Sequence, residues 1–330
     1  MLRSLYAGIS GMKANQTKLD IIANNIANCG TTAFKSSRVR FQDMVSQSMS
    51  DASSSSTNTG GVNGKQIGLG VQIAGIDTMV GQGMMQPTSR NLDVAMDGEG
   101  YLIVANGPIE GTITVDDKHN MGTSTLDTSY TRDGALTLDD AGHLLTSDGL
   151  RVMGYAIGAT TYDAATGVPT IAFVDANDKD AAKASADLIP LSIPNEMVGK
   201  DNAIHKVKSF SIEKDGTIKA TLDGGGIAAI GQIAMASFNN PAGLSKVGKN
   251  LYTSTSNSGV AVVRSGLGAA TANDNSKAYA SMLSGMLEMS NVDLAEQFTD
   301  MIVASRAFQA MGKTITTGDE ILQDIIGLKR

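Results

Sequence analysis
Apolar side chains recur every third or fourth residue through the last forty residues of the chain. One set of these positions is apolar throughout, and the set that alternates with it is mixed. The first set is Leu294, Met301, Phe308, Ile315 and Leu322, and the second is Phe298, Ser305, Gly312, Asp319 and Ile326. This spacing predicts a helix over 292–326, about 50 Å long at 1.5 Å per residue, with a seam that lies against other helices. We expect Asn291 to cap its start, and Ser290-x-x-Asp293 resembles a capping box with Asp in place of Glu.

A second seam of the same kind runs through the first twenty-eight residues. Its positions are Leu2, Leu5, Ile9, Met12, Gln16, Leu19, Ala23 and Ile26, of which only Gln16 is polar. We expect a helix from Leu2 to Asn28, ended by the Asn- and Gly-rich stretch at its end. Gly8 and Gly11 each destabilise such a helix by up to about 1 kcal/mol relative to Ala, so the helix is marginal on its own.

The two terminal segments carry opposite charge. Residues 1–28 hold three basic side chains and one acidic one, a net charge of +2, and residues 288–330 hold seven acidic and four basic ones, a net charge of −3. Complementary helices tend to pair, although an exposed ion pair contributes only about 0.2–1 kcal/mol. The pattern leaves two interpretations open, because the helices either pack on a globular body or bind partner helices.

From Gln66 onward the apolar period changes from 3.5 to 2, which indicates strands. Asp-Gly pairs follow many of these segments and are a strong hairpin signal. The strand candidates are 66–73, 92–96, 101–105, 130–138, 150–157, 207–222, 230–238 and 250–263. The predicted fold class is therefore α+β, with terminal α-helices that form a coiled-coil-like inner domain and a β-rich antiparallel body between them.

The same patterns predict the domain boundaries. We expect residues 1–30 and 277–330 to form a helical domain, and 66–157 with 205–276 to form the β-rich core. Residues 31–65 are expected to be a linker, because the stretch from Ser46 to Gly64 is rich in Ser and Gly. Residues 158–204, with more Ala, Asp and Lys, are expected to be a small insertion.

Composition excludes several classes of protein. The net charge of −7 does not favour binding to nucleic acid or to an anionic membrane. The chain has one cysteine, Cys29, so it cannot form an intrachain disulfide. No run of 18 apolar residues occurs, so no membrane span is expected, and the polar residues of the first helix do not fit a cleavable signal peptide.

No catalytic constellation emerges from the sequence. His119, His143 and His205 lie far apart and are expected to be solvated. Gly312-Lys313-Thr314 lacks the first glycine and the preceding strand of a phosphate loop. Asp175-x-Asn177-x-Lys179-Asp180 has a lysine at a ligand position of a calcium loop and lacks its turn glycine. We therefore expect no enzyme activity, no cofactor, no metal and no small-molecule substrate.

Several strings resemble one family, the flagellar rod and hook proteins of bacteria. The strings are Leu19-Asp20-Ile21-Ile22-Ala23-Asn24-Asn25-Ile26-Ala27-Asn28, Ala33-Phe34-Lys35, Tyr130-Thr131-Arg132-Asp133-Gly134, Gly149-Leu150-Arg151-Val152-Met153-Gly154-Tyr155, Phe238-Asn239-Asn240-Pro241-Ala242-Gly243-Leu244, Ser290-Asn291-Val292-Asp293-Leu294 and Arg306-Ala307-Phe308-Gln309-Ala310. The segment Val71-Gln72-Ile73-Ala74-Gly75-Ile76 resembles the hook proteins in particular. However, the insertion at 158–204 is too short for the full outer domain of the larger hook proteins, which keeps the distal rod as the alternative.

The resemblance implies a subunit of the flagellar hook, a flexible curved tube that transmits torque from rod to filament. It implies export through the flagellar type III apparatus without a cleaved signal peptide, and a location on the extracellular part of the flagellum. The implied partners are other copies of the chain, the rod, the hook cap and the hook–filament junction proteins. We expect the polymer contacts to involve Leu5, Ile9, Met12, Leu19, Ile26, Leu294, Phe298, Met301, Phe308, Ile315 and Leu322. A secreted adhesin or tail-fibre module would share the β-rich body but would not need matched apolar seams at both termini.

Overall fold

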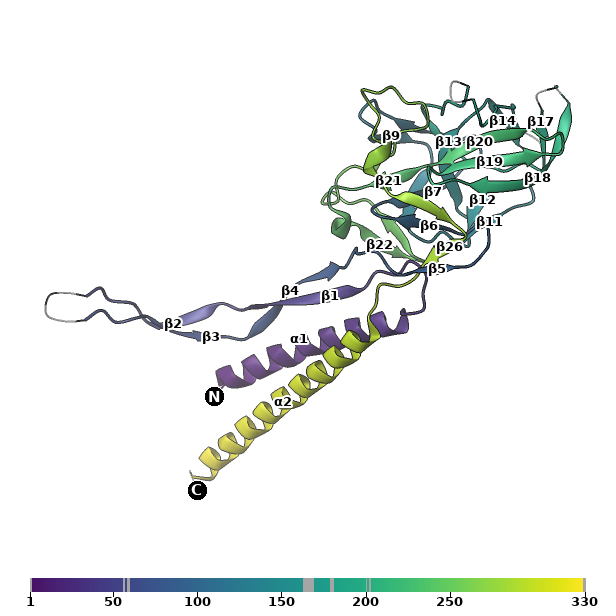
Figure 1. Ribbon diagram of the computed structural model, residues 1–330. Coiled ribbons are helices and arrows are strands. Elements are labelled where there is room, and N and C mark those ends of the chain that lie inside the picture. The colour runs from purple at the N-terminus through teal and green to yellow at the C-terminus, as the bar shows by residue number, and fades with distance from the viewer. Residues whose placement is uncertain are drawn as a thin grey trace. The chain divides into compact units, whose positions relative to one another are not determined.

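The computed structural model describes residues 2–55, 57, 60–162, 169–178, 181–199, 201 and 203–328. The chain divides into two compact units. The helical unit comprises Met1–Gly30, Lys35–Met79 and Val292–Arg330, and the β body comprises Thr31–Phe34 and Val80–Asn291. The α+β class predicted from the sequence is confirmed, since the chain consists of an N-terminal helix, a β-rich antiparallel body and a C-terminal helix (Figure 1).

The terminal helices pair with each other inside the helical unit. α1 spans Leu2–Ala27 and α2 spans Leu294–Gly327, close to the predicted bounds. They run antiparallel, because Lys18 near the end of α1 meets Asp300 near the start of α2. The N- and C-termini therefore lie at the same end of the pair (Figure 1).

The predicted cap of α2 is wrong by two residues. Asp293, not Asn291, is the N-cap, and its Oδ1 accepts hydrogen bonds from the backbone N–H groups of Ala295 and Glu296. Asn291 instead donates its side-chain amide to the carbonyl of Gly81 in the β body. A carboxylate at this position also suits the positive end of the helix dipole.

A long β-ribbon forms the rest of the helical unit, and we call it the ribbon arm. Its strands are β1 (Ser37–Asp43), β2 (Ser46–Ser50), β3 (Lys65–Gly68) and β4 (Val71–Thr78). β1 pairs with β4 and β2 with β3, all antiparallel, which gives the narrow two-stranded shape seen in Figure 1. The predicted linker at 31–65 thus contains strands. The predicted strand at 66–73 belongs to this ribbon and not to the β body.

The β body is built on one large antiparallel sheet, in which sixteen strands join among the described residues. Its main path runs in the order β17-β18-β19-β20-β13-β7-β10-β23-β22. The strands on this path are β7 (Tyr101–Asn106), β10 (Asp127–Thr131), β13 (Arg151–Ala156), β17 (Glu196–Val198), β18 (Ile204–Ile212), β19 (Thr217–Leu222), β20 (Ile227–Ile233), β22 (Ser245–Gly248) and β23 (Leu251–Thr253). The strands that attach beside it are β8 (Ile113–Val115), β9 (Met121–Ser124), β11 (Leu136–Leu138), β12 (Leu144–Thr146), β16 (Leu188–Pro190), β21 (Met235–Ser237) and β24 (Val262–Val263).

Smaller strand pairs and short helices complete the body. The pairs are β14 (Thr160–Tyr162) with β15 (Pro169–Ile171), β25 (Ser281–Ser284) with β6 (Val94–Asp97), and β26 (Met286–Glu288) with β5 (Met85–Pro87). The 3₁₀ turns are η1 (Pro241–Gly243) and η2 (Ser276–Ala278). β25 and β26 fall within 277–291, which was expected to be helical. Gly285, at φ +76°, makes the turn between them.

The expected insertion at 158–204 is partly built into the main sheet. β16 pairs with β13 and β8, and β17 pairs with β18. Leu188, Leu191, Ile193 and Met197 from this segment are buried. Its apolar positions therefore form part of the β-body core, although the polar residues between them made it look like a surface elaboration.

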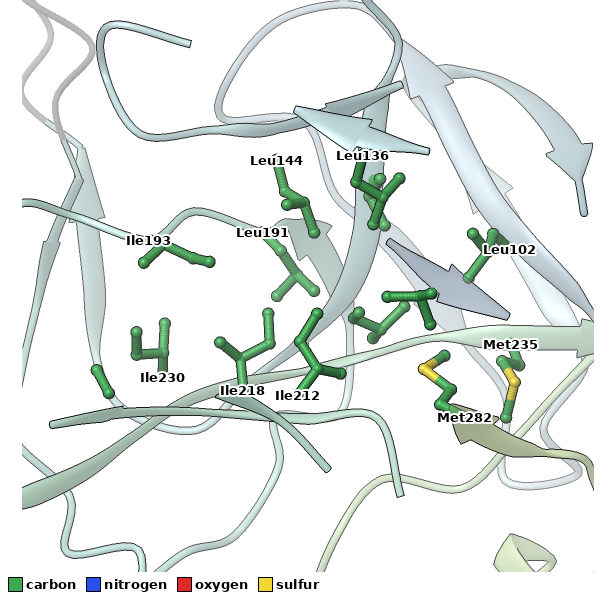
Figure 2. Close-up of a cluster of buried hydrophobic side chains, with 14 of the residues drawn as sticks. Leu102, Leu136, Leu144, Leu191, Ile193, Ile212, Ile218, Ile230, Met235 and Met282 are labelled. Carbon is green, nitrogen blue, oxygen red and sulfur yellow. The ribbon is translucent and has the colours of Figure 1, made fainter. Parts of the chain in front are cut away.

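The β body has an apolar core that is divided into clusters. One cluster fills the space between the sheet and the strands that cover it, and Figure 2 shows its leucine, isoleucine and methionine side chains pointing toward one another. It includes Leu102, Leu136, Leu144, Leu191, Ile193, Ile212, Ile218, Ile230, Met235 and Met282. A second cluster contains Tyr101, Tyr130, Phe238 and Tyr252, whose rings make edge-to-face contacts. Together the clusters supply the apolar burial that stabilises a domain of this size.

Candidate assembly surface
Exposed large hydrophobic side chains are concentrated in the helical unit. Of twenty-six such side chains among the described residues, twenty-one lie in this unit, which holds about a third of the chain. Those on the ribbon arm and the segment after it are Phe41, Met44, Val45, Met49, Val62, Ile67, Leu69, Ile73, Ile76 and Met79. Those on the helices are Tyr6, Ile9, Leu294, Phe298, Ile302, Val303, Phe308, Ile321, Ile325, Ile326 and Leu328. So many exposed large apolar side chains in one unit are typical of a surface that takes part in protein–protein interaction.

The helical unit also lacks a core of its own in the described part of the chain. The buried residues of all three hydrophobic clusters come from the β body. The hydrophobic residues buried in the helical unit, as far as the structure describes it, are Ala14, Ile22 and Ala304. A pair of amphipathic helices obtains most of its stability from burial of an apolar face, and here that face is largely uncovered.

Small residues bring the two helices close together. Gly8 faces Ile315, and a Cβ at position 8 would lie 3.2 Å from its Cγ1. Gly11 faces Met311, and Gly318 of α2 faces Leu5. Ala14 of α1 and Ala304 of α2 are buried as well. The helix–helix contact therefore depends on glycine and alanine, which allow close approach of the backbones.

The predicted seam coincides with this contact only in part. Leu5 and Ile315 take part in it, and Met12, Leu19, Ile26, Met301 and Leu322 are half-buried. Ile9, Leu294, Phe298 and Phe308 are exposed, with Phe298 at 50 %. None of the eleven predicted residues is fully buried in the single chain. Sequence reasoning missed Gly8, Gly11 and Gly318, although the recurrence Gly8-x-x-Gly11-x-x-Ala14 is a signal for close helix packing.

Two polar contacts join the helices as well. Lys18 Nζ lies 3.1 Å from Asp300 Oδ1, which is one realised instance of the predicted charge complementarity. Asn25 donates its side-chain amide to Oε1 of Gln297 at 3.0 Å, and Asn25 is 2 % exposed. The ribbon arm contacts α1 too, since the backbone N–H of Val71 donates to Ser10 Oγ.

The string Tyr130-Thr131-Arg132-Asp133-Gly134 forms a junction within the β body. Arg132 donates from Nε to Glu288 Oε2 at 3.0 Å, and the two side chains are 2 % and 0 % exposed. Glu288 Oε1 accepts from the backbone N–H of Gly83, and the Glu288 carbonyl accepts from Ala33 N–H. This buried ion pair therefore holds the segment Thr31–Phe34 and strand β26 to the rest of the body.

Asp133 and Gly134 complete that junction. Asp133 Oδ1 accepts hydrogen bonds from Thr32 Oγ1 and from Ala135 N–H. Burial raises the pKa of Asp133 above its ordinary value of 3.8, and the two hydrogen bonds offset this only in part. A Cβ on Gly134 would lie 1.6 Å from the Val94 carbonyl oxygen, so no other residue fits there without movement of the backbone.

The residues considered for chemistry do not form a catalytic site. Among the residues that the structure describes, no group of three or more His, Cys, Asp and Glu side chains could hold a metal ion. His143 is buried and stacks on Tyr162, so the expectation that it is solvated is wrong. Gly312-Lys313-Thr314 lies within α2. Part of the calcium-like string, Lys179 and Asp180, falls outside the described residues. Neither α1 nor α2 has a stretch long and apolar enough to cross a bilayer.

The β body has its own apolar core, whereas the helical unit leaves much of its apolar surface uncovered. These features are typical of a subunit that buries the rest of its apolar surface in an assembly. Three family models match the chain. "Flagella basal body rod protein" matches residues 5–35, "Flagellar hook protein FlgE/F/G D1 domain" matches 95–220, and "Flagellar basal body rod FlgEFG protein C-terminal" matches 283–328.

Full-length relatives agree with these models. The chain is 40 % identical over 330 residues to the flagellar basal-body rod protein FlgG of Bacillus subtilis, with all of both chains covered. It is 32 % identical over 332 residues to FlgG of Borreliella burgdorferi, again with full coverage of both. The flagellar hook protein FlgE of the same species is 29 % identical over 468 aligned residues, also with full coverage. The chain belongs to the family of flagellar basal-body rod and hook proteins, which are structural components of the flagellum.

Proposed function
We propose that this chain is the distal rod subunit of the bacterial flagellar basal body. The observation that carries the proposal is the 40 % identity to FlgG of Bacillus subtilis over 330 residues, which covers both chains completely. The alignment with the hook protein FlgE of Borreliella burgdorferi extends to 468 residues, well beyond the length of this chain. A rod protein therefore accounts for the whole length without a missing outer domain.

The helical unit is the polymerising part of the subunit. Exposed Ile9, Phe298 and Phe308 and the half-buried seam residues beside them bury their remaining surface against neighbouring copies of the chain. The predicted contact set is Leu5, Ile9, Met12, Leu19, Ile26, Leu294, Phe298, Met301, Phe308, Ile315 and Leu322. Because the helices have little burial of their own, their pairing is only marginally stable in the free chain and is readily lost, which suits export through the flagellar type III apparatus.

Deletion of the gene in its host tests the assignment to the distal rod. Isolated basal bodies would be imaged by electron microscopy. A distal rod subunit predicts rods that end before their distal segment and carry no hook. Complete rods without a hook would assign the chain to the hook, and unchanged flagella would contradict both assignments.

The hook, predicted first from the sequence, is the second candidate. The match of residues 95–220 to the FlgE/F/G D1 domain and the similarity to two FlgE proteins favour it. As a hook subunit the chain would polymerise into a curved tube that meets the rod, the hook cap and the hook–filament junction proteins.

Phe308→Asp tests the role of the seam in either polymer. Phe308 is 37 % exposed in the single chain, so a carboxylate there is tolerated by the monomer. Buried between subunits without a partner, the same charge is strongly unfavourable, and we expect no tubes to form while the β body stays folded. Phe308→Leu is the matched control, since it keeps an apolar side chain and should assemble. If Phe308→Asp formed normal tubes in electron micrographs, the proposal that the seam is buried between subunits would be wrong.

A further inference from the structure
A buried asparagine joins three elements of the helical unit where α1 ends. Asn25 is 2 % exposed and lies in the last turns of α1. Its Oδ1 accepts a hydrogen bond from the backbone N–H of Ser37 at 3.0 Å, and its Nδ2 donates to the Ser37 carbonyl at 2.9 Å. The same Nδ2 donates to Oε1 of Gln297 in α2 at 3.0 Å. One side chain thus binds α1 to the first residue of β1 and to α2.

The two bonds to Ser37 close the free edge of the ribbon arm at its root. In an antiparallel pair, successive residues direct their backbone groups to opposite sides of the strand. The Ser36 carbonyl accepts from Met79 N–H on the side of β4, and the backbone groups of Ser37 point the other way, to Asn25. The asparagine amide therefore takes the place of a neighbouring strand at this one residue.

The third bond makes this arrangement depend on the C-terminal helix. An asparagine amide has two N–H donors, and Asn25 uses both, one on Ser37 and one on Gln297. If α2 were absent or shifted along α1, one N–H of the buried Asn25 amide would have no acceptor. A buried donor without an acceptor destabilises the folded state. The amide would then rotate or become hydrated, and the bonds to Ser37 would weaken.

We propose that Asn25 couples the pairing of the terminal helices to the anchoring of the ribbon arm. The arm root is held firmly only after α2 has paired with α1 in the correct register. A chain with an incomplete or misplaced α2 then presents a loosely anchored arm. This inference rests on the proposed function only in taking the helical unit as the assembling part. It makes Asn25 a positioning residue that works through Ser37 and Gln297.

Hydrogen exchange of the full-length monomer, followed by mass spectrometry, tests the coupling. Gln297→Leu removes the acceptor on α2 and keeps a side chain of similar size, while Asn25 and Ser37 themselves are unchanged. Gln297→Glu keeps an oxygen acceptor. Lys18→Met removes the other polar link between the same helices, the ion pair with Asp300, and does not touch the arm.

We expect Gln297→Leu to speed exchange of the amides of Ser37–Asp43 by about tenfold, while exchange in the helices changes by less than about twofold, because local opening is measured apart from global unfolding. Gln297→Glu and Lys18→Met should leave the arm root as in the unmodified chain. Unchanged exchange at the arm root in Gln297→Leu would overturn the proposal. So would equal acceleration by Lys18→Met, since any loss of helix pairing would then suffice. Both readings come from the monomer, so they are independent of the gene-deletion result.

Discussion
At the scale of single residues, two positions of the string Tyr130–Gly134 accept only one kind of residue, because of the groups that lie next to them. Arg132 needs a buried carboxylate, which Glu288 supplies from 156 residues away in the sequence. Removing one member of such a buried pair is strongly destabilising, because the other charge is left without compensation. Gly134 is required because the Val94 carbonyl occupies the place where any Cβ would be. Arg132 and Gly134 of this string are therefore each required by a contact within the β body.

Asp133→Asn should change how stability depends on pH. Burial raises the pKa of Asp133 above 3.8, so the folded state favours the protonated acid. The stability that this group contributes is present below the unfolded pKa and is lost as pH rises through the folded pKa. Asn keeps an oxygen acceptor for Ala135 N–H and has no charge to bury. The midpoint of thermal unfolding of Asp133→Asn minus that of the unmodified chain should therefore increase as the pH rises from about 3 to about 7.

An exposed carboxylate gives the control for that experiment. Asp140→Asn changes the net charge by the same amount at an exposed position. Its unfolding midpoint should follow the unmodified chain across the same pH range. If the difference in unfolding midpoint between Asp133→Asn and the unmodified chain stayed constant or fell with pH, the two hydrogen bonds of Asp133 would outweigh its desolvation.

Residue partners of this kind could be predicted only in part. The sequence marks Asp293 as part of a capping-box pattern, but Asn291 and Asp293 are both good caps, and only the path of the chain before α2 decides between them. Asn291 is used elsewhere, on the Gly81 carbonyl. His143 shows the same limit, since its burial depends on strand packing far from it in the sequence.

At the scale of elements, both helices were predicted within two residues of their observed ends, but the face that pairs them was predicted only in part. Hydrophobic periodicity ranks Ile9 and Phe298 above glycine, and these large side chains stay exposed. The helices meet instead through Gly8, Gly11 and Gly318, where close approach of two backbones needs small residues. A pattern read from apolar character cannot see this contact, because glycine contributes nothing to it.

Gly8→Val should separate the helices. The new Cβ would lie 3.2 Å from Ile315 Cγ1 and Thr314 Oγ1, and the added methyl groups would come closer still. Overpacking of this kind destabilises by about 1–3 kcal/mol, a large effect for a helix pair with little other burial. We expect a lower melting temperature for the helical signal in far-UV circular dichroism.

The same substitution at Gly312 isolates the effect of crowding. Nothing lies within 4 Å of a Cβ built at Gly312, and that residue too is inside a helix. Gly312→Val should melt at or slightly above the temperature of the unmodified chain, since valine is a better helix former than glycine. Equal losses in both variants would mean that Gly8 does not face α2 as described.

The first half of the ribbon arm was missed for a different reason, whereas the strand predicted at 66–73 covers most of β3 and the start of β4. β2 is exposed along its whole length and lies in a stretch rich in serine and glycine. A strand that buries neither face needs no alternation of polar and apolar residues, and Ser46–Ser50 holds a single apolar side chain. Only its pairing with Lys65–Gly68 defines it as a strand.

At the scale of the whole molecule, buried and exposed apolar side chains are divided between the two units. The β body holds the three hydrophobic clusters, and the helical unit holds most of the exposed large hydrophobic side chains. The predicted division into a helical part and a β-rich part placed 66–79 in the body and 277–291 with the helices. In the structure, β3 and β4 pair only within the ribbon arm, whereas β25 and β26 pair with β6 and β5 of the body.

This division predicts that the fragment Val80–Asn291 folds alone. It keeps the main sheet, both large core clusters and the strands β25 and β26, so we expect a soluble monomer with a β-rich circular dichroism spectrum and a cooperative unfolding transition of about 5–15 kcal/mol. The fragment Thr31–Asn291 adds the hydrogen bonds of Thr32 and Ala33 to Asn250, Asp133 and Glu288, each of which contributes about 0.5–1.5 kcal/mol. It should therefore unfold at higher denaturant concentration, although it also carries the exposed ribbon arm.

Neither fragment should form tubes, because both lack α1 and α2. A molten or helix-rich Val80–Asn291, or tubes formed by either fragment, would show that stability and assembly are not divided between the two units in this way.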